Sequence, residues 1–202
     1  MMLKTLAITF CCTFLFWAEP SQAGENFNER IFVVGYEADS PPYVFNDAQG
    51  EPDGFSIALI KAVAKEQGLH VHFQEAAWAE TFRALERGDI DAIAAMGYSE
   101  KRAKNFILGT PYLSDELTLF RREGSPSVAS TGDLLGKKVL VLQSGISHEY
   151  LLKVAAGAKL IAVKRWPEIL SRLAAGEADY AMMPNMAGRY FIKQLQLFEL
   201  VS

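Results

Sequence analysis

The chain has 202 residues, half of them hydrophobic, and a formal net charge of −4. This weak acidic balance argues against a nucleic-acid partner, because such a protein needs a basic stripe and none is visible. The only cysteines, Cys11 and Cys12, lie inside an apolar run near the N-terminus. The rest of the chain therefore offers no disulfide, no thiolate metal site and no catalytic thiol.

The N-terminal segment has the features of a secretory signal peptide. An apolar run over residues 6–18 follows Lys4, and the small residues Ser21 and Ala23 come shortly after it. The run is too short to span a membrane comfortably, and the small residues suit the positions before a cleavage site. We predict a signal peptide over residues 1–23, cleaved after Ala23, and a periplasmic location. A retained membrane anchor is the alternative.

Apolar runs typical of β-strands recur along the rest of the chain, with helical periodicity in most of the intervals. Two helices show an apolar stripe followed by a glycine in the position of a C-terminal stop, at Gly68 and at Gly88. Strands that alternate with helices predict an α/β fold with mostly parallel sheets. The strand-like runs are 31–36, 71–74, 90–94, 117–120, 139–142, 160–163 and 180–183.

An internal repeat indicates two lobes. In residues 85–92 and again in residues 173–180, a helix ends at a glycine, an acidic turn follows, and a strand begins after an aspartate. The polar connector over residues 123–127 follows a strand and is interpreted as the first crossing between lobes. We therefore predict a first lobe over residues 24–121 and a second over residues 122–202. Facing α/β lobes bind small molecules between the carboxyl ends of their strands.

The segment from Ala95 to Arg102 is the strongest candidate for ligand binding. Ser99 is a natural N-cap for a new helix, and Arg102 follows one turn later. Free backbone amides, the helix dipole and the planar guanidinium could then converge on one anion, most simply a carboxylate. The alternative is an ordinary helix start whose arginine faces solvent.

The order and spacing of several short motifs resemble those of the bacterial extracellular solute-binding proteins, family 3, the periplasmic amino-acid-binding type. The resemblance covers residues 30–202 and implies a two-lobed periplasmic binding protein type II fold, a Venus flytrap that closes on its ligand by hinge motion. The motifs are residues 40–45, 53–56, Trp78, 88–91, 99–102, 111–112, 135–139 and 143–147.

The resemblance also implies a ligand site with residues from both lobes. In it Arg102 clamps the ligand carboxylate at the helix start, and no cofactor, metal or enzymatic step is expected. Trp78 could instead be part of the core, and Ser147 could simply cap a helix. The implied ligand-binding residues are Tyr43, Trp78, Gly97, Ser99, Arg102, Gly145, Ser147 and Asn185.

Several positions depart from the amino-acid binders. The late second-lobe strand runs into Met182–Asn185 and lacks the acidic residue that would hold a ligand ammonium group. Gly97 stands where a hydroxyl is usual, and Ser40 stands where an aromatic ring is frequent. These departures weigh against a standard α-amino acid. Glu37 or Asp39 could supply a compensating charge, although we expect both to lie in a solvated turn.

The C-terminal residues 198–202 resemble the strand before the return crossing, so we expect the first lobe to lack its closing portion. The chain is then a fragment, a truncated reading frame or a variant that recruits a partner. The segment 97–104, together with Asn185, resembles flytrap domains of sensor kinases and cyclic-dinucleotide synthases. Three uses remain open: delivery of a solute to an ABC permease, input to a signalling partner, or a fragment that binds nothing.

Enzyme interpretations are weaker. His70, His72 and His148 have no joint metal-binding spacing, and an exposed or edge strand explains the first two. Ser147 precedes His148 directly, but neighbours on a helix do not face each other as a nucleophile and its base must. The carboxylates over residues 89–91 are expected to terminate a turn.

Overall fold

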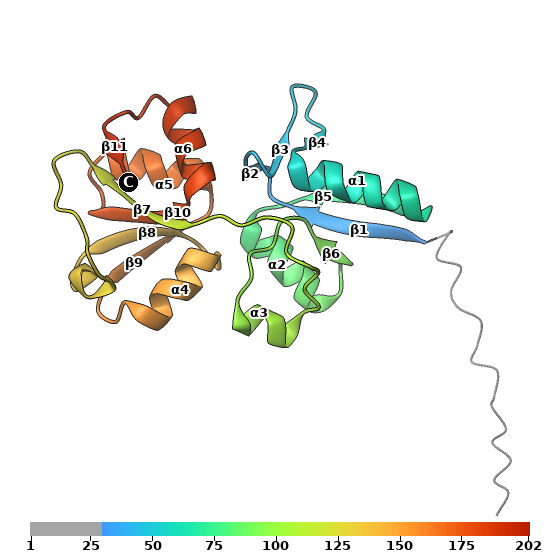
Figure 1. Ribbon diagram of the computed structural model, residues 1–202, viewed down its shortest axis with the longest axis horizontal. Coiled ribbons are helices and arrows are strands. Elements are labelled where there is room, and N and C mark those ends of the chain that lie inside the picture. The colour runs from blue at the N-terminus through green and yellow to red at the C-terminus, as the bar shows by residue number, and fades with distance from the viewer. Residues whose placement is uncertain (1–29) are drawn as a thin grey trace, which may run out of the picture.

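The computed structural model describes residues 30–202, so the predicted signal peptide lies outside the described residues. Two α/β lobes lie side by side, each built around its own sheet (Figure 1). The sheet of lobe 1 has the strand order β5–β1–β6, and that of lobe 2 has the order β11–β7–β10–β8–β9. The predicted two-lobed α/β architecture is confirmed.

Lobe 1 comprises a parallel sheet, a small antiparallel sheet and three helices. Two helices end as predicted, because Gly68 and Gly88 adopt left-handed conformations, with φ of 67° and 76°, that side chains disfavour. The elements are β1 (Ile31–Tyr36), β2 (Asp39–Ser40), β3 (Val44–Asn46), β4 (Pro52–Asp53), α1 (Phe55–Gln67), β5 (His70–Glu75), α2 (Trp78–Arg87), β6 (Ala92–Ile93) and α3 (Glu100–Asn105).

Lobe 2 is a mixed sheet with helices on both faces. Strands β8, β9 and β10 are parallel, while β7 runs antiparallel to both β10 and β11. The elements are β7 (Leu117–Arg122), the 3-10 helix η1 (Thr131–Leu134), β8 (Lys138–Leu142), α4 (Ile146–Val154), β9 (Lys159–Val163), α5 (Trp166–Ala174), β10 (Tyr180–Pro184), α6 (Asn185–Gln194) and β11 (Leu200–Val201).

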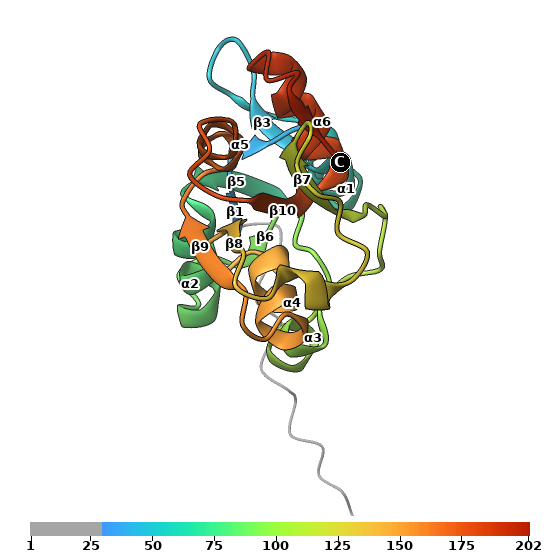
Figure 2. The ribbon, with the colours of Figure 1, turned by 90° about the vertical axis from the view of Figure 1, so that its left-hand side faces the viewer.

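Alternation along β8 and β10 explains the core of lobe 2. Leu140 and Met183 point to the face covered by α5 and α6, whereas Val139 and Met182 belong to the cluster that includes Leu151 of α4. Figure 2 shows α4 on one side of this sheet and α5 with α6 on the other. The period-2 pattern therefore separates two hydrophobic clusters around a single sheet.

The sheet pairing differs from the predicted boundary between the lobes. The sequence placed the boundary at residue 121, after the strand, but β7 pairs with β10 and β11 in the sheet of lobe 2. Such pairing joins segments about 60 to 80 residues apart and leaves no local signal. We propose that lobe 1 ends with α3 at residue 105, that residues 106–116 form the crossing, and that lobe 2 begins at residue 117.

The two lobes are in contact. Trp78 of α2 belongs to the same buried cluster as Leu140, Trp166 and Ile169 of lobe 2, and Phe82 packs against that cluster. Among the helices of residues 30–202, none is both long enough and apolar enough to cross a membrane.

Candidate functional site

The N-cap predicted at the start of α3 is confirmed. Ser99 has the extended backbone expected of a cap, with φ −146° and ψ 155°, and its Oγ accepts a hydrogen bond from the backbone N–H of Arg102 at 3.1 Å. Because α3 has only six residues, the hydrogen bond from this cap stabilises a large part of the helix. Arg102 is thereby held one turn into the helix.

Arg102 is buried at the contact between the lobes, with 1% of its surface exposed. The predicted alternative, an arginine that faces solvent, is wrong. Its Nε and Nη2 donate to Oε1 of Glu149 in α4 at 3.0 and 2.9 Å. The guanidinium thus binds a carboxylate that the chain itself supplies.

The remaining polar contacts complete this cluster. Nη1 of Arg102 donates to the carbonyl oxygen of Gly97, and Nη2 donates to that of Ser144, both at 3.1 Å. The Ser99 hydroxyl donates to Oε2 of Glu149 at 3.0 Å, so both oxygens of that carboxylate have donors. Burial lowers the pKa of the Arg102 guanidinium, and the adjacent Glu149 carboxylate opposes this effect.

Two aromatic rings flank the guanidinium. The Cζ atom of Arg102 lies 5.2 Å from the centroid of the Trp78 ring and 5.4 Å from that of Phe82. The Trp78 indole Nε1 also donates to the carbonyl oxygen of Ser144 at 2.8 Å, a contact from lobe 1 to lobe 2. Trp78 is therefore a core residue, the alternative considered for it, and its ring also lies beside Arg102.

Glu37 corrects another expectation. It is buried, with 8% of its surface exposed, and does not lie in a solvated turn. Its carboxylate accepts hydrogen bonds from the backbone N–H of Trp78 at 3.4 Å and from the indole of Trp166 at 3.1 Å. Burial raises the pKa of Glu37 from 4.5 to about 7, while these two hydrogen bonds oppose the rise.

Asp39 also lies at the contact between the lobes. Its two carboxylate oxygens accept from Nε and Nη2 of Arg165 at 2.5 and 2.9 Å. The Arg165 side chain is 67% exposed, so the pair is a surface contact. Asp39 is therefore ion-paired with a residue of lobe 2.

Tyr43 is buried near the crossing segment. Its hydroxyl donates to Oδ2 of Asp115 at 2.7 Å and lies 3.0 Å from the sulfur of Met186 in lobe 2. Burial and the Asp115 carboxylate both raise the pKa of Tyr43. This predicted wall residue thus links lobe 1, the crossing segment and α6.

The second-lobe residues have different surroundings. Gly145 precedes α4, and the fully buried Ser147 hydroxyl has no hydrogen-bond partner among the described residues. Asn185 is already engaged, because its Nδ2 donates to Thr118 Oγ1 at 2.9 Å and its Oδ1 accepts from Arg189 Nε at 2.7 Å. Ser147 retains a free polar group, whereas Asn185 does not present one.

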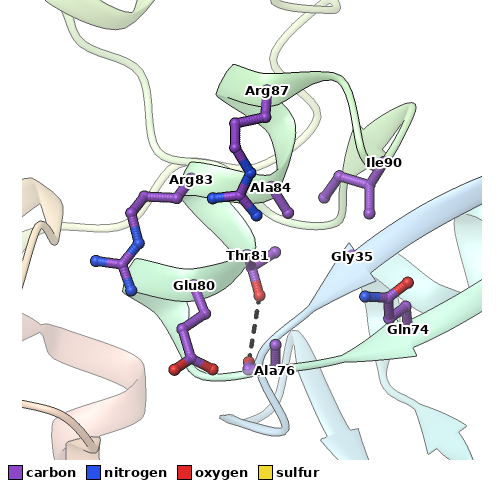
Figure 3. Close-up of a pocket in the computed structure, with 9 residues that line it drawn as sticks. All are labelled: Gly35, Gln74, Ala76, Glu80, Thr81, Arg83, Ala84, Arg87 and Ile90. Carbon is purple, nitrogen blue, oxygen red and sulfur yellow. Dashed lines mark hydrogen bonds between the residues drawn. The ribbon is translucent and has the colours of Figure 1, made fainter.

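A cavity of about 300 Å³ lies elsewhere on lobe 1, between α2 and the ends of β1 and β5 (Figure 3). It is lined by none of the residues predicted to bind ligand. Its buried hydroxyl, on Thr81, already donates to the carbonyl oxygen of Ala76 at 3.3 Å. The charged side chains at its rim belong to Glu80, Arg83 and Arg87.

Within residues 30–202, no group of three or more His, Cys, Asp or Glu side chains could hold a metal ion. His70 and His72 are exposed on β5, an edge strand of its sheet, as expected. His148 Nδ1 accepts from the backbone N–H of Ser144 at 3.3 Å, and burial lowers its pKa.

Two α/β lobes thus meet around the buried Arg102. The model of the bacterial extracellular solute-binding proteins, family 3, matches residues 32–153, and the chain belongs to that family. This confirms the resemblance that the sequence motifs indicated.

Curated relatives include transport receptors. A probable amino-acid ABC transporter-binding protein of Haemophilus influenzae is 29% identical over 166 residues, which cover 82% of this chain and 64% of the relative. The L-cystine-binding protein TcyA of Bacillus subtilis is 24% identical, over 88% of this chain and 63% of the relative. The chain therefore spans less than two thirds of the length of these relatives.

Solved structures confirm the periplasmic binding protein fold. A histidine kinase sensor domain with similarity to periplasmic binding proteins superimposes with a TM-score of 0.81 at 37% identity, covering 86% of this chain and 76% of the other. An ancestral arginine-binding protein bound to arginine gives a TM-score of 0.76 at 33% identity, covering 85% and 77%.

Proposed function

We propose that this protein binds a small, amino-acid-like solute through its carboxylate, between the two lobes, and performs no chemistry on it. One observation carries the proposal: the buried guanidinium of Arg102 already holds a carboxylate at 2.9–3.0 Å. The Glu149 carboxylate stands where a carboxylate of the solute would bind. Ser99 and Trp78 lie beside this position, and the unpartnered hydroxyl of Ser147, in the same first turn of α4 as Glu149, completes the proposed site.

The proposed use is delivery of the solute to an ABC-type permease from the periplasm, after cleavage of the signal peptide at Ala23. Relatives support this use, because they include an amino-acid ABC transporter-binding protein, an L-cystine-binding protein and a glutamine-binding protein. A lysine/arginine/ornithine-binding periplasmic protein of Escherichia coli, 26% identical, supports the location. Permease and ATPase genes beside this gene would favour transport.

A second candidate is a ligand-sensing module of a signalling protein. The match to a histidine kinase sensor domain favours it. So does the site itself, since Asn185 replaces the expected acid and both ends of its amide are engaged. Without that acid the cleft is a poorer receptor for a standard α-amino acid.

Calorimetric titration with L-arginine, L-glutamine and L-cystine tests the proposal, with the methyl ester of each compound as the matched control. The ester keeps the side chain and the amino group, loses the negative charge and is larger by one methyl group. We expect one free acid to bind, its ester to bind at least tenfold more weakly, and Arg102→Gln to weaken binding of the acid by about 10- to 150-fold, the range of a charge-assisted hydrogen bond. An ester that binds as tightly as its acid would refute the carboxylate role. A chain that binds none of the acids would favour the fragment interpretation.

A further inference from the structure

We propose that Glu149 is an internal competitor for the carboxylate site: it holds the lobes together when no solute is bound, and a solute must displace it to reach Arg102. That Glu149 holds the lobes together follows from the geometry alone. That a solute must displace Glu149 rests on the proposed function of the site.

Glu149 of lobe 2 contacts residues of lobe 1. Its side chain is 16% exposed and accepts three hydrogen bonds, two from Arg102 and one from the Ser99 hydroxyl, at 2.9–3.0 Å. All three donors belong to α3 or its cap, 47 to 50 residues away in the chain. Glu149 lies in the first turn of α4, where the helix dipole favours a carboxylate. This carboxylate therefore joins the two lobes through an ion pair.

The same contacts occupy the site. The guanidinium makes four hydrogen bonds: two to Glu149, one to Gly97 and one to Ser144. A solute carboxylate needs the donors that Glu149 now uses. With Glu149 removed, Arg102 would remain buried and charged without a counterion, which is strongly unfavourable in a closed cleft. The chain thus supplies its own counterion in the closed state.

A second ion pair between the same helices provides a matched control. Glu100 of α3 and Lys153 of α4 approach to 3.7 Å, but their side chains are 78% and 77% exposed. Such a surface pair contributes little. Glu100→Gln therefore makes the same chemical change as Glu149→Gln, between the same two helices, without touching Arg102.

The test is the distance between α3 and α4 without solute, measured by pulsed electron spin resonance. Spin labels are attached to cysteines that replace the exposed residues Lys104 and Leu152. The full chain carries serine in place of Cys11 and Cys12, its only native cysteines, so that labelling is specific. The compared chains are the parent, Glu149→Gln, Glu149→Ala and Glu100→Gln, each checked for folding by circular dichroism.

We expect a single short distance in the parent and in Glu100→Gln, and a longer or broader distribution in both Glu149 variants. Folded Glu149 variants that keep the parent distance would overturn the internal competitor. Titration of Glu149→Gln with the same three amino acids separates this result from the proposed function. A compound that binds the parent should bind Glu149→Gln at least tenfold more tightly, and equal affinity would refute competition. If the lobes open but no acid binds either chain, the closure stands and the proposed function fails.

Discussion

The carboxylate of Glu37 accepts a hydrogen bond from the indole of Trp166 at 3.1 Å, joining the residue after β1 in lobe 1 to the first residue of α5 in lobe 2. The same carboxylate accepts from the backbone N–H of Trp78. A buried acid at a contact between lobes makes the stability of the closed form depend on pH.

The first prediction concerns that dependence. Because the pKa of Glu37 rises from 4.5 to about 7, the folded protein binds more protons than the unfolded chain between these values. The contribution of Glu37 protonation to the free energy of unfolding is complete below pH 4.5 and is lost as pH rises through 7. The shift in pKa corresponds to a total loss of about 3 kcal/mol. We expect urea unfolding to show this loss in the wild type and not in Glu37→Gln. The exposed control Glu66→Gln should retain it; the same pH dependence in Glu37→Gln would refute the assignment.

Trp78 gives a second prediction. Trp78→Phe keeps an aromatic ring beside Arg102 but removes the donor to the Ser144 carbonyl oxygen, which still accepts from Arg102. No buried acceptor is then left unpaired, so the free energy of unfolding should fall by only about 0.5–1.5 kcal/mol. Chemical denaturation measures this, and a loss above about 3 kcal/mol would mean that the indole packs in a way the phenyl ring cannot replace.

Local sequence patterns predicted much of this fold. The stops at Gly68 and Gly88 and the cap at Ser99 depend on residues a few positions apart, so they can be read from the chain directly. Local patterns could not predict the lobe to which β7 belongs or the partner of Arg102, because both depend on pairing between distant segments.

Glu149 and Glu37 show why the site was harder to predict than the fold. Glu149 follows Gly145 by one helical turn, which could have signalled a carboxylate at the start of a helix, but not which arginine it meets. Glu37 has the local pattern of a turn, but it is buried and its carboxylate accepts a hydrogen bond from Trp166 of lobe 2. Tertiary contact therefore overrides the local expectation.

Substitution of Ser147 should affect ligand affinity without lowering the stability of the fold. Its buried hydroxyl has no partner among residues 30–202, so Ser147→Ala loses no hydrogen bond, removes an unpaired buried polar group and should raise the free energy of unfolding by about 1 kcal/mol. Ser99→Ala removes a cap that bonds Arg102 and Glu149 and should cost about 1–2 kcal/mol. If solute uses the Ser147 hydroxyl, affinity falls in Ser147→Ala while stability is kept. A large loss of stability would show that Ser147 has a structural role.

Gly188 tests the packing of α6 on the sheet. A Cβ atom at this position would lie 2.3 Å from the ring of Phe120, which is 1% exposed and cannot move freely. Overpacking outweighs the better helix propensity of alanine, and we expect Gly188→Ala to lose about 1–2 kcal/mol in thermal or chemical unfolding. The exposed Gly109, with open space around its Cβ position, is the control and should tolerate alanine. Equal stability of the two variants would contradict this close approach.

The buried pair of Arg102 and Glu149 is the central claim, and a double-mutant cycle tests it most directly. Free energies of unfolding are measured for the wild type, Arg102→Gln, Glu149→Gln and the double variant. Each single change leaves one charge without its ionic partner, whereas the double change removes both charges. We predict that the double variant loses about 2–3 kcal/mol less than the sum of the single losses. Additivity within about 0.5 kcal/mol would contradict a buried carboxylate site that joins the two lobes.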